Sequence, residues 1–473
     1  MENYIVAIDL GTSHARLVVG QCDEKKPYGL NVVSTETQRS QGMKRGAVYS
    51  KDDVIKVVKN LILGADKKIN AGRRRTANAP QPSRKVCVNI SGLNFQTSIV
   101  REKVSLQSAP VSLRTLKYIE TQAINNQMQY ATDDQVTRVV PLGYSIDNEP
   151  DTDDVLGHVG GVLEAKFLCF KSKQKDLALL SSVFPTTHRP EAFYASTSAK
   201  AAVVLASQPH LMRDGVLLVD LGYGTTGVAA YSRGALRYEV SIPIGSETIT
   251  TDIEQALDIA NEDAEYLKCN VGIIDEAQAR KSFEVDVPSG GTVSFEGAFF
   301  NMVIKARVEE IAAYVFAAYK EAQKRGCRDV KMVLTGGGAH LCRVGEVLEA
   351  ATGIPVVALP PLSVGLSFSL DDYAGALGMA SIEARNFLAQ LAMQPKQQQL
   401  PIEEVPDEGE AAASEPEGGR LEADEAGVRT EPEEDRAAPV RRNAAQRRGA
   451  GFLAKMGKWF DGAFDDENNS KSN

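Results

Sequence analysis

The chain has 473 residues, 43% of them hydrophobic, which is enough for two or three domains with substantial cores. The net charge is −9, but residues 403–436 alone carry 14 acidic and 3 basic side chains. The remainder is therefore nearly neutral, which argues against a nucleic-acid partner. Six scattered cysteines form no C-x-x-C pair, which indicates a reducing compartment and gives no zinc site. No apolar run approaches the roughly 18 residues of a membrane span, and a strand-like segment begins almost at once, so no signal peptide is expected.

Two segments of the chain follow the same pattern. Residues 8–13 read Ile-Asp-Leu-Gly-Thr-Ser, and residues 219–226 read Val-Asp-Leu-Gly-Tyr-Gly-Thr-Thr. Each lies between two apolar runs, which predicts a hairpin whose tight turn presents backbone N–H groups and hydroxyls beside an acidic residue. A third segment, residues 334–341, follows a predicted strand and carries three glycines, which let backbone approach a flat ligand closely. Together they suggest two related half-domains that close on one phosphate chain.

These segments predict a phosphate site with a metal. Asp9 and Asp220, facing each other across a triphosphate, would hold Mg²⁺ directly or through its waters, and Arg16 would add positive charge. Asp-x-Gly is also ordinary turn chemistry, an alternative that weakens when two such turns and a glycine loop occur together. The other residues expected at this site are Gly11, Thr12, Ser13, Gly222, Tyr223, Gly224, Thr225, Thr226, Gly336, Gly337, Gly338 and His340. The chain has no Walker-type loop and no recognisable nucleophile–base set.

The elements between the turns predict mixed sheets covered by helices. A helix is predicted over 53–63, followed by a basic loop at 64–85 that contains Arg73, Arg74 and Arg75 and is either a solvated insertion or a binding patch. Short strands at 86–90, 136–141 and 144–146 with a helix at 113–129 predict a small insertion. An Ala/Ser-rich segment at 181–204 predicts helix, and residues 247–326 are predicted to be largely helical, with helices at 249–257, 263–268 and 301–325.

The end of the chain has a different character. Residues 394–443 contain six prolines, the acidic run and no apolar period, which is typical of a disordered tether. Apolar residues then recur every three or four positions opposite two lysines, which predicts a short basic amphipathic helix for a membrane surface. The alternative is that this stripe docks on the protein's own core or on a partner. The residues expected to contact lipid are Phe452, Leu453, Lys455, Met456, Lys458, Trp459, Phe460 and Phe464.

With these residues in view, the chain resembles the actin superfamily, and within it the FtsA family of bacterial cell division proteins. The resemblance covers about residues 3–385 and the final helix. It rests on Gly-Met-Lys-Arg-Gly-Ala-Val at 42–48, Asn-Ile-Ser-Gly at 89–92, Val-Val-Pro-Leu-Gly-Tyr-Ser-Ile-Asp at 139–147, Ile-Pro-Ile-Gly-Ser-Glu-Thr-Ile-Thr-Thr-Asp-Ile at 242–253, Asp-Ala-Glu-Tyr-Leu-Lys at 263–268 and Tyr-Ala-Gly-Ala-Leu-Gly at 373–378. It implies an α/β, ribonuclease H-like, two-lobed fold with a relocated insertion.

The resemblance also implies a function. It implies a protein that binds ATP with Mg²⁺, polymerises on the cytoplasmic face of the plasma membrane at the division site, and anchors FtsZ there. It adds Gly245 to the expected nucleotide-binding residues, and Glu265 and Lys268 as ribose contacts. Glu265 and Lys268, three positions apart on a helix, also fit a surface ion pair. The expected partners are the FtsZ C-terminal peptide, further copies of the chain, anionic lipids and other division proteins. Arg307 is the expected FtsZ contact.

The chain departs from its relatives in ways that predict slow ATP hydrolysis at most, with ATP as a structural and polymerisation ligand. Tyr223 stands where relatives often have Gly, and Glu-Ala-Phe-Tyr-Ala at 191–195 replaces their E-P-x-A pattern. The expected division is a first lobe at 1–85 and 162–214, an insertion at 86–161, a second lobe at 215–246 and 330–393 with a helical part at 247–329, an acidic linker at 394–446 and a membrane helix at 447–466. The alternatives are a PilM-like or other actin-fold assembly ATPase, an MreB-like scaffold, a DnaK-type chaperone, and a sugar or acid kinase, for which no catalytic acid or sugar pocket can be assigned.

Overall fold

The computed structural model describes residues 3–71, 83–129, 133–359 and 369–393. The chain divides into two units, residues 1–397 and 398–473, and only the first contains described residues. The loop with Arg73, Arg74 and Arg75, the acidic linker and the expected membrane helix therefore lie outside the described residues. Among the described helices, none is both long enough and apolar enough to span a membrane.

The first sheet has five strands in the order β10-β6-β1-β2-β3. β1 and β2 form the predicted antiparallel hairpin, β3 continues it, and β6 and β10 lie parallel on the other side of β1. The strands are β1 (Asn3–Leu10), β2 (His14–Cys22), β3 (Leu30–Arg39), β6 (Ser83–Ile90) and β10 (Ala192–Ala195).

The second sheet repeats most of this topology, with the order β13-β12-β11-β16. Again three strands form an antiparallel meander, and a parallel strand, β16, pairs with the first of them. The strands are β11 (Val216–Leu221), β12 (Thr226–Ser232), β13 (Ala235–Ile242) and β16 (Lys331–Thr335). The same arrangement around each Asp-x-Gly turn is the structural form of the repeat seen in the sequence.

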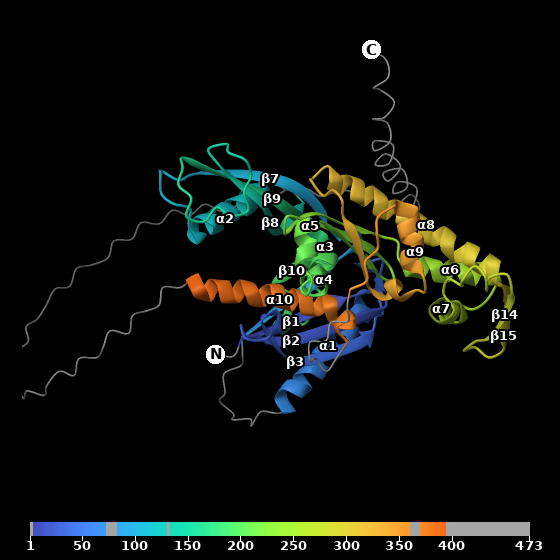
Figure 1. Cartoon of the computed structure of the whole chain (residues 1–473). Coiled ribbons are helices and arrows are strands. Elements are labelled where there is room, and N and C mark those ends of the chain that lie inside the picture. Colours follow the sequence, from blue (N-terminus) through green and yellow to red (C-terminus); the bar gives the residue numbers. More distant parts are fainter. Residues whose placement is uncertain (1–2, 72–82, 130–132, 360–368, 394–473) are drawn as a thin grey trace, which may run out of the picture. The chain divides into compact units, whose positions relative to one another are not determined.

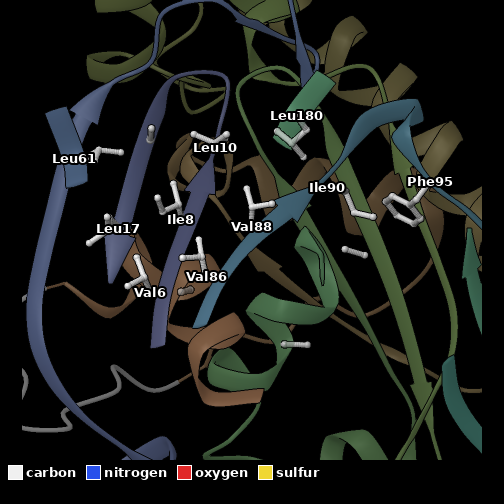
Figure 2. Close-up of a cluster of buried hydrophobic side chains, with 14 of the residues drawn as sticks. Val6, Ile8, Leu10, Leu17, Leu61, Val86, Val88, Ile90, Phe95 and Leu180 are labelled. Atoms are coloured by element: carbon white, nitrogen blue, oxygen red, sulfur yellow. The ribbon is translucent and has the colours of Figure 1, made fainter. Parts of the chain in front are cut away.

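Alternating side chains of β1 supply two different cores, as expected for a strand covered on both faces. Val6, Ile8 and Leu10 face a large core that also receives Val88 of β6 (Figure 2). Ile5 and Ala7 belong to a second core on the opposite side of the strand. The large core extends to the second sheet through Leu218 and Ala229, so the two sheets share buried contacts.

Helices cover these cores. α1 contributes Val54, Val57, Val58 and Leu61, an i, i+3, i+4, i+7 stripe, to the large core. α10 runs along β1 and β2 and packs on α4 (Figure 1). A separate core lies between α6, α7, α8, α9 and the second sheet. The helices are α1 (Lys51–Ala71), α2 (Leu113–Gln129), α3 (Gln174–Ser181), α4 (Ser196–Val204), α5 (Pro209–Asp214), α6 (Ser246–Leu257), α7 (Asn261–Asn270), α8 (Gly297–Gln323), α9 (Val344–Thr352) and α10 (Leu370–Met393), with 3-10 turns at Pro27–Gly29, Gly92–Asn94, Thr186–His188 and Gly337–His340.

A third sheet, in the order β7-β9-β8, packs with α2 around its own core. Its strands are β7 (Gln96–Ser105), β8 (Asp134–Ile146) and β9 (Val162–Lys173). Its limits therefore differ from the expected insertion at 86–161, because β6 pairs with β1 in the first sheet and β9 runs to Lys173. Apolar pattern identifies a strand but not its pairing partner, which is why both limits were misplaced.

Four secondary-structure predictions need correction. The loop predicted at 64–85 overlaps both its neighbours, since α1 continues to Ala71 and β6 begins at Ser83. The helix predicted over 181–204 contains the strand β10, since pairing with β6 overrides the Ala/Ser-rich composition. The segment predicted as largely helical contains a hairpin of β14 (Ser282–Asp286) and β15 (Thr292–Glu296). The strands predicted at 136–141 and 144–146 are one strand, β8, with a register shift at Pro141/Gly143. A further short pair, β4 (Met43–Lys44) and β5 (Ala47–Val48), precedes α1.

Candidate functional site

The two Asp-x-Gly turns meet. A Cβ atom on Gly224, in the β11–β12 turn, would lie only 2.5 Å from Oγ1 of Thr12, in the β1–β2 turn. This distance leaves no room for a side chain at position 224, so the glycine is required by the contact itself. The turns are thus direct neighbours in space although about 210 residues separate them in the chain.

A cavity of about 630 Å³ opens beside this contact. It is lined by both turns, the glycine loop after β16, α7 and the start of α10. The predicted site residues that line it are Asp9, Gly11, Thr12, Ser13, Arg16, Asp220, Gly222, Tyr223, Gly224, Thr225, Glu265, Lys268, Gly336, Gly337, Gly338 and His340. Thr226 and Gly245 do not line it.

Thr226 and Gly245 instead lie behind the second turn. The hydroxyl of Thr226 donates to the carbonyl of Ile244 at 2.8 Å. A Cβ on Gly245 would lie 2.4 Å from the carbonyl oxygen of Tyr223, so this glycine allows the start of α6 to close on the turn. The amides of Ser246 and Glu247 then donate to the carbonyls of Gly222 and Tyr223 at 2.9 and 2.8 Å. These bonds hold the second turn against the start of α6.

The acidic residues at the inner end have different partners. Asp9 and Asp220 are 8% and 7% exposed. Lys200 Nζ donates to Oδ1 of Asp220 at 2.7 Å, whereas the Asp9 carboxylate accepts no hydrogen bond from any described residue. Burial raises the pKa of Asp9, and the charge of Asp220 adds to this effect while Lys200 and Arg16 oppose it.

One wall of the cavity is polar and fully bonded. Lys268 Nζ donates to Glu265 Oε2 at 2.6 Å, to Thr250 Oγ1 at 2.8 Å and to the carbonyl of Ser246 at 3.2 Å. Its ammonium also lies 5.1 Å from the ring centre of Tyr223. Lys268 therefore joins α6, α7 and the second turn, and Glu265, with 35% of its side chain exposed, is the more accessible of the two.

Arg16 and the glycine loop form other parts of the lining. Arg16 lies opposite Asp9 in the β1–β2 register, and its guanidinium contacts Asp372 of α10 at 2.9 Å. Gly336 has a φ of 87°, and a Cβ there would lie 2.4 Å from Oδ1 of Asp220. Gly337 has no neighbour within 4 Å of such a Cβ, so the loop leaves open space where the cavity begins.

Several lining residues were not expected from the sequence. They come from the strand after α1, from α4 and α6, and from the edges of the cavity: His14, Asn89, Ser91, Ser196, Lys200, Ser246, Cys269, Leu341, Ser369, Asp371 and Asp372. Lys200 is the most consequential of them, and no pattern in the sequence around it indicates that it lines the cavity. Glu191, which stands in the altered E-P-x-A segment, is exposed and does not line the cavity.

Arg307, the expected partner contact, is already paired. Its Nε and Nη2 donate to Oδ2 and Oδ1 of Asp252 at 2.6 and 2.9 Å, and Nη1 contacts Glu310. These bonds join α8 to α6. In the part of the chain that the structure describes, no group of three or more His, Cys, Asp or Glu side chains has the arrangement of a metal site.

The duplicated sheets and the cavity between their turns define a class, the actin-like fold. A chain of the solved PilM-PilN type IV pilus biogenesis complex has this architecture: it matches with a TM-score of 0.55 at 13% identity, covering 81% of this chain and 98% of that one. At this identity the match establishes the fold. The predicted actin-like α/β fold is therefore confirmed.

The sequence comparisons narrow the class. The family model for "Cell division protein FtsA" matches residues 217–378. The cell division protein FtsA of Bacillus subtilis is 24% identical over 392 residues, covering 80% of this chain and 83% of that protein. The FtsA of Rhizobium meliloti is 23% identical over 417 residues, covering 80% and 91%. The expected resemblance to FtsA is confirmed, and it extends over most of the chain.

Proposed function

We propose that this chain is an ATP-binding cell division protein that polymerises on the cytoplasmic face of the plasma membrane at the division site and anchors FtsZ there. The observation that carries the nucleotide part is the close packing of Gly224 on Thr12, so close that a Cβ on Gly224 would lie 2.5 Å from Thr12 Oγ1; it brings the two turns to one cavity. Oriented backbone amides of this kind bind phosphate oxygens. The cell division role is supported by the similarity to FtsA proteins.

The metal proposal rests on the donor chemistry. Mg²⁺ takes carboxylate oxygens, phosphate oxygens and water, and Asp9 offers a carboxylate that no described hydrogen-bond donor contacts. When bound, the ion would neutralise phosphate charge. The phosphates would be held by the two turns: Gly11, Thr12, Ser13, Gly222, Tyr223, Gly224 and Thr225. The ribose would lie at Glu265 and Lys268, and the base at Gly336, Gly337, Gly338 and His340. Thr226 and Gly245 would act indirectly, by supporting the second turn.

ATP then acts as a polymerisation ligand, with slow hydrolysis at most. At the inner end of the cavity α4 presents Ser196 and Lys200, neither of which is an acid that orients a water. ATP should therefore raise the melting temperature of the protein, and the protein should hydrolyse it only slowly. An increase in melting temperature with ATP that survives long incubation would agree; no ATP-dependent increase at all would refute the nucleotide proposal.

Membrane attachment is proposed for the segment around Trp459 and Phe460, from its apolar periodicity alone. Co-sedimentation of the full chain with anionic vesicles tests it. Trp459→Glu with Phe460→Glu should abolish sedimentation, whereas Asn468→Glu with Asn469→Glu adds the same charge nearby and should reduce it far less. Equal losses in both variants would mean that charge, and not the apolar stripe, determines binding.

FtsZ binding is proposed for the part of the chain that contains α6 and α8, where Arg307 has 26% of its side chain exposed. Arg307→Glu should weaken pull-down of an FtsZ C-terminal peptide while ATP binding persists. Because this change also breaks the contact with Asp252, Asp252→Asn is the matched control: it breaks the same pair but leaves the guanidinium. Equal weakening by both would assign Arg307 a structural role.

A second candidate is a pilus-type assembly ATPase, favoured by the fold match to the PilM-PilN complex chain. The sequence beyond residue 394, with its acidic run and amphipathic stripe, supports the first proposal instead. Binding of the FtsZ peptide and of anionic vesicles by the same chain would decide for cell division. Binding of neither would favour the alternative.

A further inference from the structure

Lys200 occupies an unusual position for a lysine. Its side chain is only 14% exposed, yet it lines the cavity, one helical turn after Ser196. Two glycines let its helix, α4, come this close. A Cβ on Gly227 of β12 would lie 1.9 Å from Oγ1 of Thr197, and a Cβ on Gly378 of α10 would lie 1.8 Å from the carbonyl oxygen of Ala199. The packing on both sides of α4 therefore fixes the starting point of the Lys200 side chain.

The ammonium group of Lys200 stands among the acids of the site. Nζ lies 2.7 Å from Oδ1 of Asp220, and the same oxygen faces Gly336 at the distance where a Cβ would collide. Lysine is a cation at neutral pH, and the nearby carboxylates of Asp220 and Asp9 both attract the Lys200 ammonium. Glycine backbone encloses one oxygen of each carboxylate, since a Cβ on Gly375 would lie 2.2 Å from Oδ2 of Asp9. The difference is the ammonium: it contacts Oδ1 of Asp220, whereas Asp9 accepts no hydrogen bond from a described residue.

This arrangement makes the two carboxylates unequal toward a divalent cation. A cation that approached Asp220 would be repelled by the ammonium or would have to displace it, and repulsion between charges at such separations is strong in a buried site. The ammonium, in turn, supplies at the inner end of the cavity the positive charge that a phosphate chain requires.

We propose that the ammonium of Lys200 neutralises charge on the bound polyphosphate and occupies the place beside Asp220 where a metal ion was expected. Asp9 is then the one protein carboxylate of this pair that interacts with Mg²⁺. The inference rests on the proposed nucleotide binding and specifies its metal requirement. Its consequence is that ATP binds with only a small dependence on Mg²⁺.

The test is equilibrium binding of ATP to the full-length chain, with excess Mg²⁺ and with EDTA. The wild type should differ between the two conditions by less than about tenfold in Kd. Lys200→Met should weaken binding in EDTA by about tenfold or more, the loss expected for one charged hydrogen bond, and weaken it less with Mg²⁺. Lys200→Arg keeps the charge and should stay closer to wild type. The same Mg²⁺ dependence in wild type and Lys200→Met would overturn the proposal.

A second comparison does not depend on the lysine variants folding. Asp9→Asn should remove most of the Mg²⁺ effect on ATP affinity, whereas Asp220→Asn should retain it. Equal effects of the two substitutions would restore a symmetric two-carboxylate site and refute the inference. If the wild-type chain binds no ATP in either condition, both the proposed function and this inference are refuted. If it binds ATP with a strong dependence on Mg²⁺, only this inference is refuted.

Discussion

Gly224→Ala is the sharpest perturbation of the contact on which the site depends. The added Cβ would lie 2.5 Å from Oγ1 of Thr12 and 2.9 Å from both its Cβ and Cγ2. Favourable contacts between such atoms lie near 3.5–4.0 Å, so one turn has to move by about 1 Å. Neither turn moves freely. Ser40 donates to the carbonyls of Gly11 and Ser13 at 2.6 and 2.8 Å, and the amides at the start of α6 donate to the carbonyls of the second turn. We expect the free energy of unfolding to fall by about 1–3 kcal/mol, the usual range for overpacking.

The assay is urea denaturation of wild type and variants, with and without ATP. Gly337→Ala is the matched control, because it adds the same methyl group to the same site where no atom lies within 4 Å. Its stability without ATP should stay close to wild type. Gly224→Ala should also lose the stabilisation by ATP, since a ligand that binds the native state raises its stability by RT ln(1 + [L]/Kd), which approaches zero when binding becomes weak.

A compensating change isolates the cause. Thr12→Gly removes the three atoms that collide, so the double variant should regain most of the stability lost in Gly224→Ala, after allowing up to about 1 kcal/mol for the flexibility of the new glycine. If Gly224→Ala is as mild as Gly337→Ala, or if Thr12→Gly gives no rescue, the two turns are not in contact and the reasoning fails.

Two further predictions concern stability. Glu239 is 1% exposed, its Oε2 has no partner among described residues, and burial raises its pKa to about 7. Because the unfolded state loses this proton at lower pH, the free energy of unfolding falls as pH rises from about 4.5 to 7, by about 3 kcal/mol at most. Denaturation curves of Glu239→Gln should not show that fall. A fall of unchanged size in the variant would exclude Glu239 as its source. Lys268→Met leaves Glu265 and Thr250 without their shared donor. It should lower the free energy of unfolding by about 1.5–3 kcal/mol, which a lower urea midpoint would show. An unchanged midpoint would mean that the hydrogen bonds of Lys268 do not stabilise the fold.

The sequence predicted the site better than the connections around it. Asp9 and Asp220 follow apolar strands, and strand ends in related halves come together, so local pattern sufficed to predict that both would line one cavity. The helix at 113–129 was predicted with the limits that α2 has, because its boundaries coincide with polar and turn-forming neighbours.

What local pattern lacked was long-range packing. β10 has only four residues in an Ala/Ser-rich segment, and its strand character comes from β6, about 100 residues earlier. Lys200 is one lysine in a helical segment, and nothing near it in the chain says that α4 is held against the second hairpin. Arg307 looked available for a partner because its strongest contact, Asp252, is 55 residues away.

The two halves of the site have diverged in a way that explains the lysine. In the first hairpin the residue opposite Asp9 is Arg16, whose guanidinium reaches α10 at Asp372. In the second hairpin the residue opposite Asp220 is Gly227, which has no side chain to place there. That absence is what lets Thr197 and α4 approach, since any Cβ at 227 would overlap the threonine hydroxyl. Each acid thus has a cation nearby, but the first half takes it from its own second strand and the second half takes it from a helix. The two turns can therefore share one backbone pattern while the cation beside each acid comes from a different part of the chain.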